Sequence, residues 1–168
     1  MNKIKSLLFS ILLVMFLCTN VWAVAGTVTG AISRVSTPYS SDIKFVKVTL
    51  TCTGGTIGDA GTIPTTVINT LTNVVAYRLT GTDLTFVQAY PGAVLPTDAS
   101  DITITMDGVD ILGGRGTNLI DATSYTSCAP GTVSAVGDVP ITGNITLNLS
   151  NNSVASSVFY VILTFRVR

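Results

Sequence analysis

Short segments in which apolar and polar residues alternate with a period of two recur along most of the chain. Such alternation is typical of β-strands that bury one face and expose the other. Less regular apolar segments, at 27–36, 74–80 and 84–89, predict further strands. The residues predicted to face inward in the four clearest strands are Val46, Val48, Leu50 and Cys52 in segment 44–52; Ile102, Ile104 and Met106 in 102–106; Ile145, Leu147 and Leu149 in 145–149; and Phe159, Val161, Leu163, Phe165 and Val167 in 154–167.

Glycine, asparagine and aspartate fall between these segments, where they favour turns. Asp107-Gly108 and the glycine-rich segment 113–116 are predicted turns or loops, and Asn151-Asn152 tolerates positive φ. We therefore expect segments 145–149 and 154–167 to form a C-terminal hairpin. No stretch carries a helical stripe, and the chain contains no Glu, a strong helix former. The pattern predicts an all-β fold, an antiparallel β-sandwich of jelly-roll or Ig-like type.

The N-terminal segment 1–23 has the three parts of a secretory signal peptide. Lys3 and Lys5 supply positive charge, segment 7–17 is apolar apart from one serine, and Val21 and Ala23 are small residues at a cleavage site. The alternative is a retained membrane anchor, but the apolar run is shorter than the roughly 20 residues that span a bilayer. We expect export to the periplasm, cell surface or extracellular space. The remaining chain, 24–168, is predicted to be one domain with no membrane span.

Charge and composition exclude several classes of function. Without Lys3 and Lys5 the chain has seven basic residues against nine aspartates, a net charge of about −2. Nucleic-acid binding depends on clustered Lys and Arg, so we expect no nucleic-acid partner. The chain has no His, the commonest general base and metal ligand, and no Glu. We expect that the protein is not an enzyme.

Two cysteines, Cys52 and Cys128, remain after the predicted cleavage, because Cys18 lies in the signal peptide. An even number of cysteines in an oxidising compartment predicts a single disulfide between them. Closing a loop of about 76 residues would stabilise the fold by roughly 4 kcal/mol in the chain-entropy model. A redox or metal-binding pair is the alternative, but the two cysteines are distant in sequence and no other soft ligand accompanies them.

Four aspartates, Asp98, Asp101, Asp107 and Asp110, form the segment closest to a chemical site. Their carboxylates could supply hard oxygen ligands to calcium, which takes six to eight of them. The spacing differs from that of an EF-hand, and aspartate is also a common turn residue. Both alternatives, calcium site and turn residues, remain open at this point. The glycine-rich segment 113–116 lacks the Lys-Ser/Thr and the helix of a phosphate-binding loop.

Two tyrosines in loop-like contexts, Tyr90 and Tyr125, raise the question of carbohydrate binding. Sugar-binding sandwiches present exposed flat rings, and these two could form a small platform. The alternative is that they cover the ends of the core, since tyrosine combines an apolar body with a polar tip.

Segment 96–118, PTDASDITITMDGVDILGGRGTN, resembles a pattern in small structural proteins of tailed bacteriophages. There a Pro-Thr-Asp lead-in is followed by a strand, an Asp-Gly turn, and a glycine-bounded loop that ends in Asn. Segments 46–53, 143–151 and 154–167 are similar to the opening and closing strands of those proteins. The resemblance implies a β-sandwich with a structural or interaction role, without catalysis, and it supplies no binding residues.

We therefore expect a secreted, non-enzymatic structural or assembly subunit of a cell-surface or extracellular, phage-like particle. Its partners would be copies of itself or other structural subunits, because a charged fraction of 11% leaves few charges to desolvate on association. The alternative is an extracellular module that binds a glycan or a host surface, with calcium held by the four aspartates.

Overall fold

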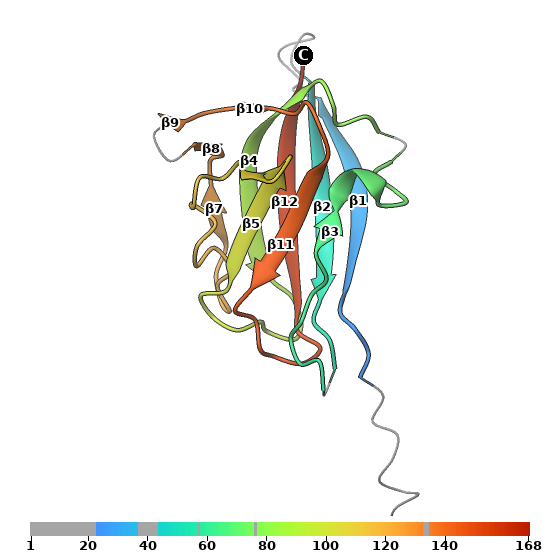
Figure 1. The fold of residues 1–168 in the computed structure, drawn as a ribbon, viewed down its shortest axis with the longest axis vertical. Helices are drawn as coiled ribbons and strands as arrows, with labels where there is room; N and C mark the ends of the chain where they lie inside the picture. Colours follow the sequence, from blue (N-terminus) through green and yellow to red (C-terminus); the bar gives the residue numbers. More distant parts are fainter. Residues whose placement is uncertain (1–22, 37–43, 57, 76, 133–134) are drawn as a thin grey trace, which may run out of the picture.

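The computed structural model describes residues 23–36, 44–56, 58–75, 77–132 and 135–168. They form two antiparallel sheets packed face to face (Figure 1), which confirms the predicted all-β, antiparallel β-sandwich. A single turn of 3-10 helix, η1 (Ile68–Thr70), is the only helical element of these residues. Within the described part of the chain, no helix is long and apolar enough to cross a membrane. The predicted signal peptide lies outside the described residues except for Ala23.

The larger sheet, sheet A, has the order β1-β2-β12-β4-β10, with β7 also paired to β4. The smaller sheet, sheet B, has the order β3-β11-β5-β6, and β8 and β9 form a separate short ladder. In Figure 1, β5 and β11 of sheet B lie in front of β2, β4 and β12 of sheet A. The strands are β1 (Thr27–Ser36), β2 (Lys44–Thr53), β3 (Thr66–Val67), β4 (Thr82–Pro91), β5 (Asp101–Met106), β6 (Val109–Asp110), β7 (Thr126–Cys128), β8 (Gly131–Thr132), β9 (Ala135–Val136), β10 (Val139–Pro140), β11 (Ile145–Ser150) and β12 (Val158–Val167).

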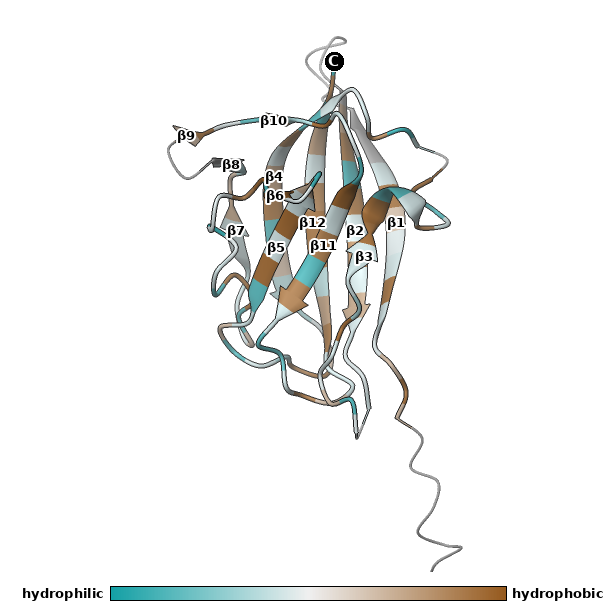
Figure 2. Ribbon diagram, viewed as in Figure 1, coloured by the Kyte–Doolittle hydropathy of each residue, from teal (hydrophilic) through white to brown (hydrophobic). Residues whose placement is uncertain are grey.

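The core lies between the sheets, and β12 supplies its centre. This strand pairs along its whole length with β2 on one side and β4 on the other. Phe159, Val161, Leu163 and Phe165 have no exposed surface, as the period-two pattern predicts. The same holds for the inward residues of β2, and Figure 2 shows the alternation as bands along the strands. The predicted inward residues at strand ends are only partly buried: Met106, Leu149 and Val167.

The predicted C-terminal hairpin is wrong. β11 pairs with β3 and β5 in sheet B, whereas β12 pairs with β2 and β4 in sheet A. The segment 151–157 therefore crosses from one sheet to the other. Asn151 has the expected positive φ of 64°, but Asn152 donates to the carbonyl of Gly61 at 2.7 Å and to the hydroxyl of Ser157 at 2.8 Å. These contacts support a crossing between layers, since both strands must bury their apolar face on the same core.

The strand predicted at 74–80 is also absent from the described residues of this segment, 74–75 and 77–80. This segment forms turns, in which the amide of Val74 donates to Leu71 and the amide of Tyr77 donates to Val74. Val74 and Leu79 are nevertheless buried and belong to the core. The segment thus fills the sandwich beneath β1, where Gly30 leaves room for it: a β-carbon at Gly30 would lie 2.7 Å from a methyl carbon of Val74.

The predicted turn at Asp107-Gly108 is confirmed. It joins β5 to β6, and both residues have positive φ, 51° and 82°. Two consecutive residues with positive φ are characteristic of a tight type I′ hairpin turn, for which Asp-Gly is a preferred sequence.

Gly116 is expected to be the glycine most sensitive to a side chain. A β-carbon there would collide with the carbonyl oxygen of Ile102, which is backbone and cannot move aside cheaply. We predict that Gly116→Ala lowers the free energy of unfolding by about 3 kcal/mol, measured by denaturant titration. The matched control is Gly137→Ala, where nothing lies within 4 Å of the new carbon, and a change below about 0.5 kcal/mol is expected. Equal effects at both positions would contradict this prediction.

Candidate functional site

The outer face of sheet A belongs to the sheet with the most strands among the described residues. Its side chains alternate with the buried ones and stand in rows across adjacent strands, as the pairing register defines. Of the described side chains named below, which leave out Arg166 at the end of β12, Lys47 is the only charged one. We define this outer face by Thr29, Ala31 and Ser33 of β1; Lys47, Thr49 and Thr51 of β2; Tyr160, Ile162 and Thr164 of β12; Phe86, Gln88 and Tyr90 of β4; and Ser127 of β7.

Three tyrosines form a stacked row at one end of this face. Tyr90 and Tyr160 are direct cross-strand partners, with ring centroids 4.6 Å apart and planes 19° apart. Tyr125, the residue before β7, stacks on the other side of Tyr90 at 4.7 Å and 14°. Tyr90 and Tyr125 thus come together, as the platform hypothesis requires. Tyr160 completes the row, and its outward position was the only signal for it in the sequence.

The stacking determines which surfaces of the tyrosine row remain available. Tyr90 lies between two rings, so both of its faces are covered, and the row presents ring edges and phenol groups to solvent. Tyr125 has a free outer face, because it ends the row and is 69% exposed. Burial, followed by the neighbouring phenols of Tyr125 and Tyr160, raises the pKa of Tyr90. Tyr90 is therefore uncharged at neutral pH, and the three stacked rings give the row an aromatic composition that is favoured at protein interfaces.

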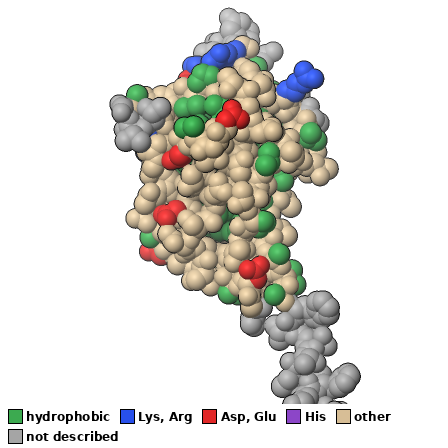
Figure 3. Space-filling model, viewed as in Figure 1, with side chains coloured by type: hydrophobic (Ala, Val, Ile, Leu, Met, Phe, Trp, Pro, Cys, Tyr) green, Lys and Arg blue, Asp and Glu red, His purple; other side chains and the backbone are tan. Residues whose placement is uncertain are grey.

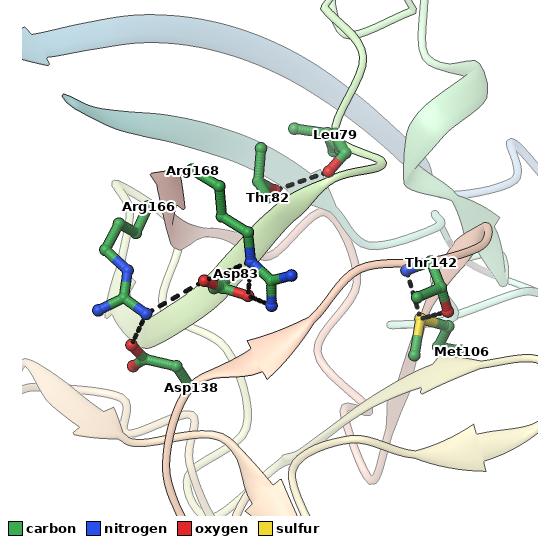
Figure 4. A network of polar contacts seen from close by, with 8 residues as sticks. All are labelled: Leu79, Thr82, Asp83, Met106, Asp138, Thr142, Arg166 and Arg168. Atoms are coloured by element: carbon green, nitrogen blue, oxygen red, sulfur yellow. Dashed lines mark hydrogen bonds and ion pairs between the residues drawn. The ribbon is translucent and has the colours of Figure 1, made fainter. Parts of the chain in front are cut away.

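A charged cluster closes the opposite end of the face, around Asp83 at the start of β4 (Figure 4). Asp83 is 3% exposed, and its carboxylate accepts from Arg166 at 3.1 Å and from the Nε of Arg168 at 2.9 Å. Arg166 also contacts Asp138 at 2.8 Å. Two arginines and two aspartates therefore neutralise one another, and the cluster presents no net charge to a ligand.

The arginines change the titration of Asp83. The hydrogen bond from Arg168, helped by Arg166, lowers the pKa of Asp83 although its burial acts in the opposite direction. The carboxylate is ionised at neutral pH, since a buried charge is tolerated where it is paired and hydrogen-bonded. Its role is structural, tying the end of β12 to β4.

The four aspartates of the predicted calcium site are not brought together. Asp98 and Asp101 lie at the start of β5 and Asp107 follows its end, about 20 Å away along the strand. Among the described residues there is no group of three or more His, Cys, Asp or Glu that could hold a metal ion. The carboxylates bind local donors instead: Asp101 accepts from the amide of Asn118 at 2.7 Å, and Asp98 from that of Ala122 at 3.3 Å. These contacts favour the turn alternative.

Asp110 has a related function in the glycine-rich loop. Its carboxylate accepts from the amides of Leu112 at 2.9 Å and Gly114 at 2.7 Å. Gly113 and Gly114 both have positive φ, a conformation that glycine adopts without strain. The amides of Leu112 and Gly114 thus bind a carboxylate of the chain itself, so these two are not available to a phosphate.

The predicted disulfide between Cys52 and Cys128 is wrong, because both thiols are free. Cys52 lies on β2 and Cys128 on β7, separated by β12 and β4. Three strand spacings amount to about 14 Å, whereas the Cα atoms of a disulfide lie within about 7 Å. Burial raises the pKa of both thiols, that of Cys128 to about 11, so both are protonated and weakly reactive at neutral pH.

The opposite side of the molecule, formed by sheet B, has a different surface. Figure 3 shows this side as mostly backbone and side chains that are neither hydrophobic nor charged, with smaller hydrophobic patches and with carboxylates scattered singly over it. Thr103 and Thr105 of β5 stand beside Asn148 and Thr146 of β11 on its outer face. Within the described residues, stacked aromatic rings occur on sheet A alone.

No protein-family model, no curated protein and no solved structure matches the chain. The resemblance to structural proteins of tailed bacteriophages therefore stays a prediction.

Asp83 is expected to make stability depend on acidity. The pKa of Asp83 is lower in the folded protein than in the unfolded chain, where it is about 3.9. The ionised carboxylate therefore stabilises the fold fully above about pH 3.9, and this stabilisation is lost as the pH falls through the folded-state pKa. We predict that Asp83→Asn lowers the free energy of unfolding at pH 7 by about 1–2 kcal/mol, and that the difference shrinks below about pH 4. Thermal unfolding between pH 2 and pH 7 tests this. Asp138→Asn is the control, with a smaller effect. If the difference in unfolding free energy between Asp83→Asn and the unsubstituted chain stayed constant with pH, the effect could not come from the ionised carboxylate of Asp83, and the prediction would be contradicted.

Proposed function

We propose that this protein is a non-enzymatic structural or assembly subunit, exported from the cytoplasm, that packs against copies of itself or other subunits in a cell-surface or extracellular particle. The observation that carries the proposal is the outer face of sheet A, which spans five adjacent strands and has Lys47 as its one charged residue between the tyrosine row and the Asp83 cluster.

The composition of this face favours a protein partner. Protein interfaces are depleted in charged residues at their centre and enriched in tyrosine and phenylalanine. Ile162 lies in the middle of the face, between Thr49 and Gln88, and Phe86 is 37% exposed one row away. Threonine hydroxyls keep such a surface soluble. Removing water from them on association costs little free energy, because they can form new hydrogen bonds across the interface.

Two further considerations support an assembly role over catalysis. Several titratable groups with shifted pKa values have structural partners or structural causes: Asp83 is paired with arginines, and the two thiols are protonated by burial. The resemblance of segment 96–118 to structural proteins of tailed bacteriophages points in the same direction. The predicted signal peptide supports an assembly outside the cytoplasm.

A charge in the middle of the face is expected to prevent self-association. We predict that purified chain 24–168 forms oligomers in a concentration-dependent manner, and that Thr49→Lys weakens this association at least tenfold, measured by sedimentation velocity. An unpaired lysine at the centre of an interface must be desolvated or opposed by its own copy, and both are unfavourable. Thr103→Lys is the matched control, a threonine in mid-strand on the outer face of sheet B. A chain that stays monomeric at high concentration, with no particle by electron microscopy, would contradict the proposal.

A second candidate function is supported by one observation, the exposed ring of Tyr125 at the end of the tyrosine row. A sugar ring can stack on one aromatic face, so the row could serve as part of a glycan-binding surface in an extracellular module.

Glycan-array binding distinguishes this candidate from assembly. If the module binds glycans, Tyr125→Ala is expected to abolish binding while leaving the fold unchanged, since the side chain is largely exposed. Loss of binding on adding a chelator would indicate that calcium takes part. Oligomers in the absence of any glycan signal would favour the assembly role.

A further inference from the structure

The four open edges of the two sheets are built very differently. In sheet B the edge strands are β3 and β6, with two residues each. One side of sheet A ends in β7, with three residues, and β10, with two residues including Pro140. Short strands, prolines and charged residues are the usual means by which proteins protect sheet edges from pairing with other chains. Three of the four edges are therefore protected.

The remaining edge, β1 (Thr27–Ser36), is neither short nor interrupted by proline, and it has a single charged residue, Arg34, near its end. It has ten residues and no proline, and it pairs with β2 in ten consecutive positions without a bulge. Its other edge faces outward, and among the described residues no segment pairs with it. Alternate backbone amides and carbonyls of β1 thus point away from the sheet along its length.

The side chains of β1 are compatible with pairing. Thr27, Thr29, Ala31 and Ser33 are small, uncharged and exposed. Arg34 is the only charged residue in the strand sequence. An approaching strand would therefore meet little steric or electrostatic obstruction.

We infer that β1 is the sheet edge through which two subunits associate. It pairs antiparallel with β1 of a second copy about a twofold axis through Ala31. The inference rests on the proposed assembly role and adds to packing through the outer face a second contact, along the sheet edge, with another copy of the chain as the partner. A twofold arrangement is self-complementary, so one edge serves both copies. The pairing would join two copies of sheet A into one continuous sheet whose outer faces lie on the same side.

The register through Ala31 follows from length and charge. An axis at Ala31 places this residue near the middle of the ten-residue strand, so nearly all of β1 can pair. Ala31 then opposes its own copy with the smallest side chain available, and Thr29 opposes Ser33. Arg34 opposes Val28, so the two arginines do not face each other.

Hydrogen–deuterium exchange tests the edge in the unaltered chain 24–168. As the concentration rises through the association range, amides in 27–36 are expected to slow at least tenfold, because the outward ones become hydrogen-bonded. Packing through the outer face alone would leave these amides unchanged, since it forms no backbone bonds. The short edges β3, β6 and β10 serve as internal controls and are expected to keep their rates.

Cysteine cross-linking tests the register. Directly opposed residues in an antiparallel pair have Cα atoms about 4.5–5.5 Å apart, within reach of a disulfide. Under mild oxidation Ala31→Cys is expected to give covalent dimers, and the unsubstituted chain controls for its own thiols. Ile162→Cys reports on face-to-face packing instead, because in the edge-paired dimer the two copies of Ile162 lie five strand spacings apart, about 24 Å.

The outcomes separate the edge from the assembly role. Slowed exchange in β1 with a cross-link at Ala31 supports the inference. Association with unchanged exchange in β1 overturns the edge inference and leaves the assembly role standing, especially if Ile162→Cys cross-links. Slowed exchange without a cross-link at Ala31 overturns the stated twofold register. A chain that never associates overturns both.

Discussion

The burial of β12 between β2 and β4 is the constraint on which the rest of the structure depends. Four consecutive inward side chains of this strand, Phe159 to Phe165, are fully removed from water. Each large apolar side chain buried in this way contributes about 1.5–3 kcal/mol. Because β12 is paired on both sides, its backbone groups are satisfied and only its outward side chains are free to face solvent. The same strand that holds the core together therefore supplies the middle of the candidate interaction face.

Local pattern was sufficient to predict the long strands and the fold class, because period two reports directly on which side of a strand is buried. It could not assign strands to sheets. Segments 145–149 and 154–167 have identical patterns whether they pair with each other or face each other across the core. The choice depends on distant contacts such as that of Asn152 with Gly61, which no local signal reveals. The turns at 74–80 were mistaken for a strand because their apolar residues fill the core without alternating.

The candidate face was only partly predictable. Alternation placed Tyr160 outward, and the loop context singled out Tyr90 and Tyr125, but stacking requires the register between β4, β7 and β12. The cysteine prediction failed for the same reason. An even count in an exported chain favours a disulfide only if the strands are neighbours, and two strands lie between Cys52 and Cys128. Composition predicts which groups are present, whereas topology decides which of them meet.

The distribution of charge explains why the surface of sheet A, rather than a pocket, is the functional candidate. Several of the few ionised groups are engaged within the fold: Asp83 with two arginines, Asp101 with Asn118 and Asn151, and Asp110 with the amides of its own loop. Each of these groups stabilises a strand end or a turn, so none is available for a ligand without loosening the structure. What remains is a broad neutral face bordered by one long, regular strand edge. Surfaces of this kind bind by packing and by backbone pairing. Both need only a partner that also has a neutral face and an open strand edge, and another copy of the chain has these features.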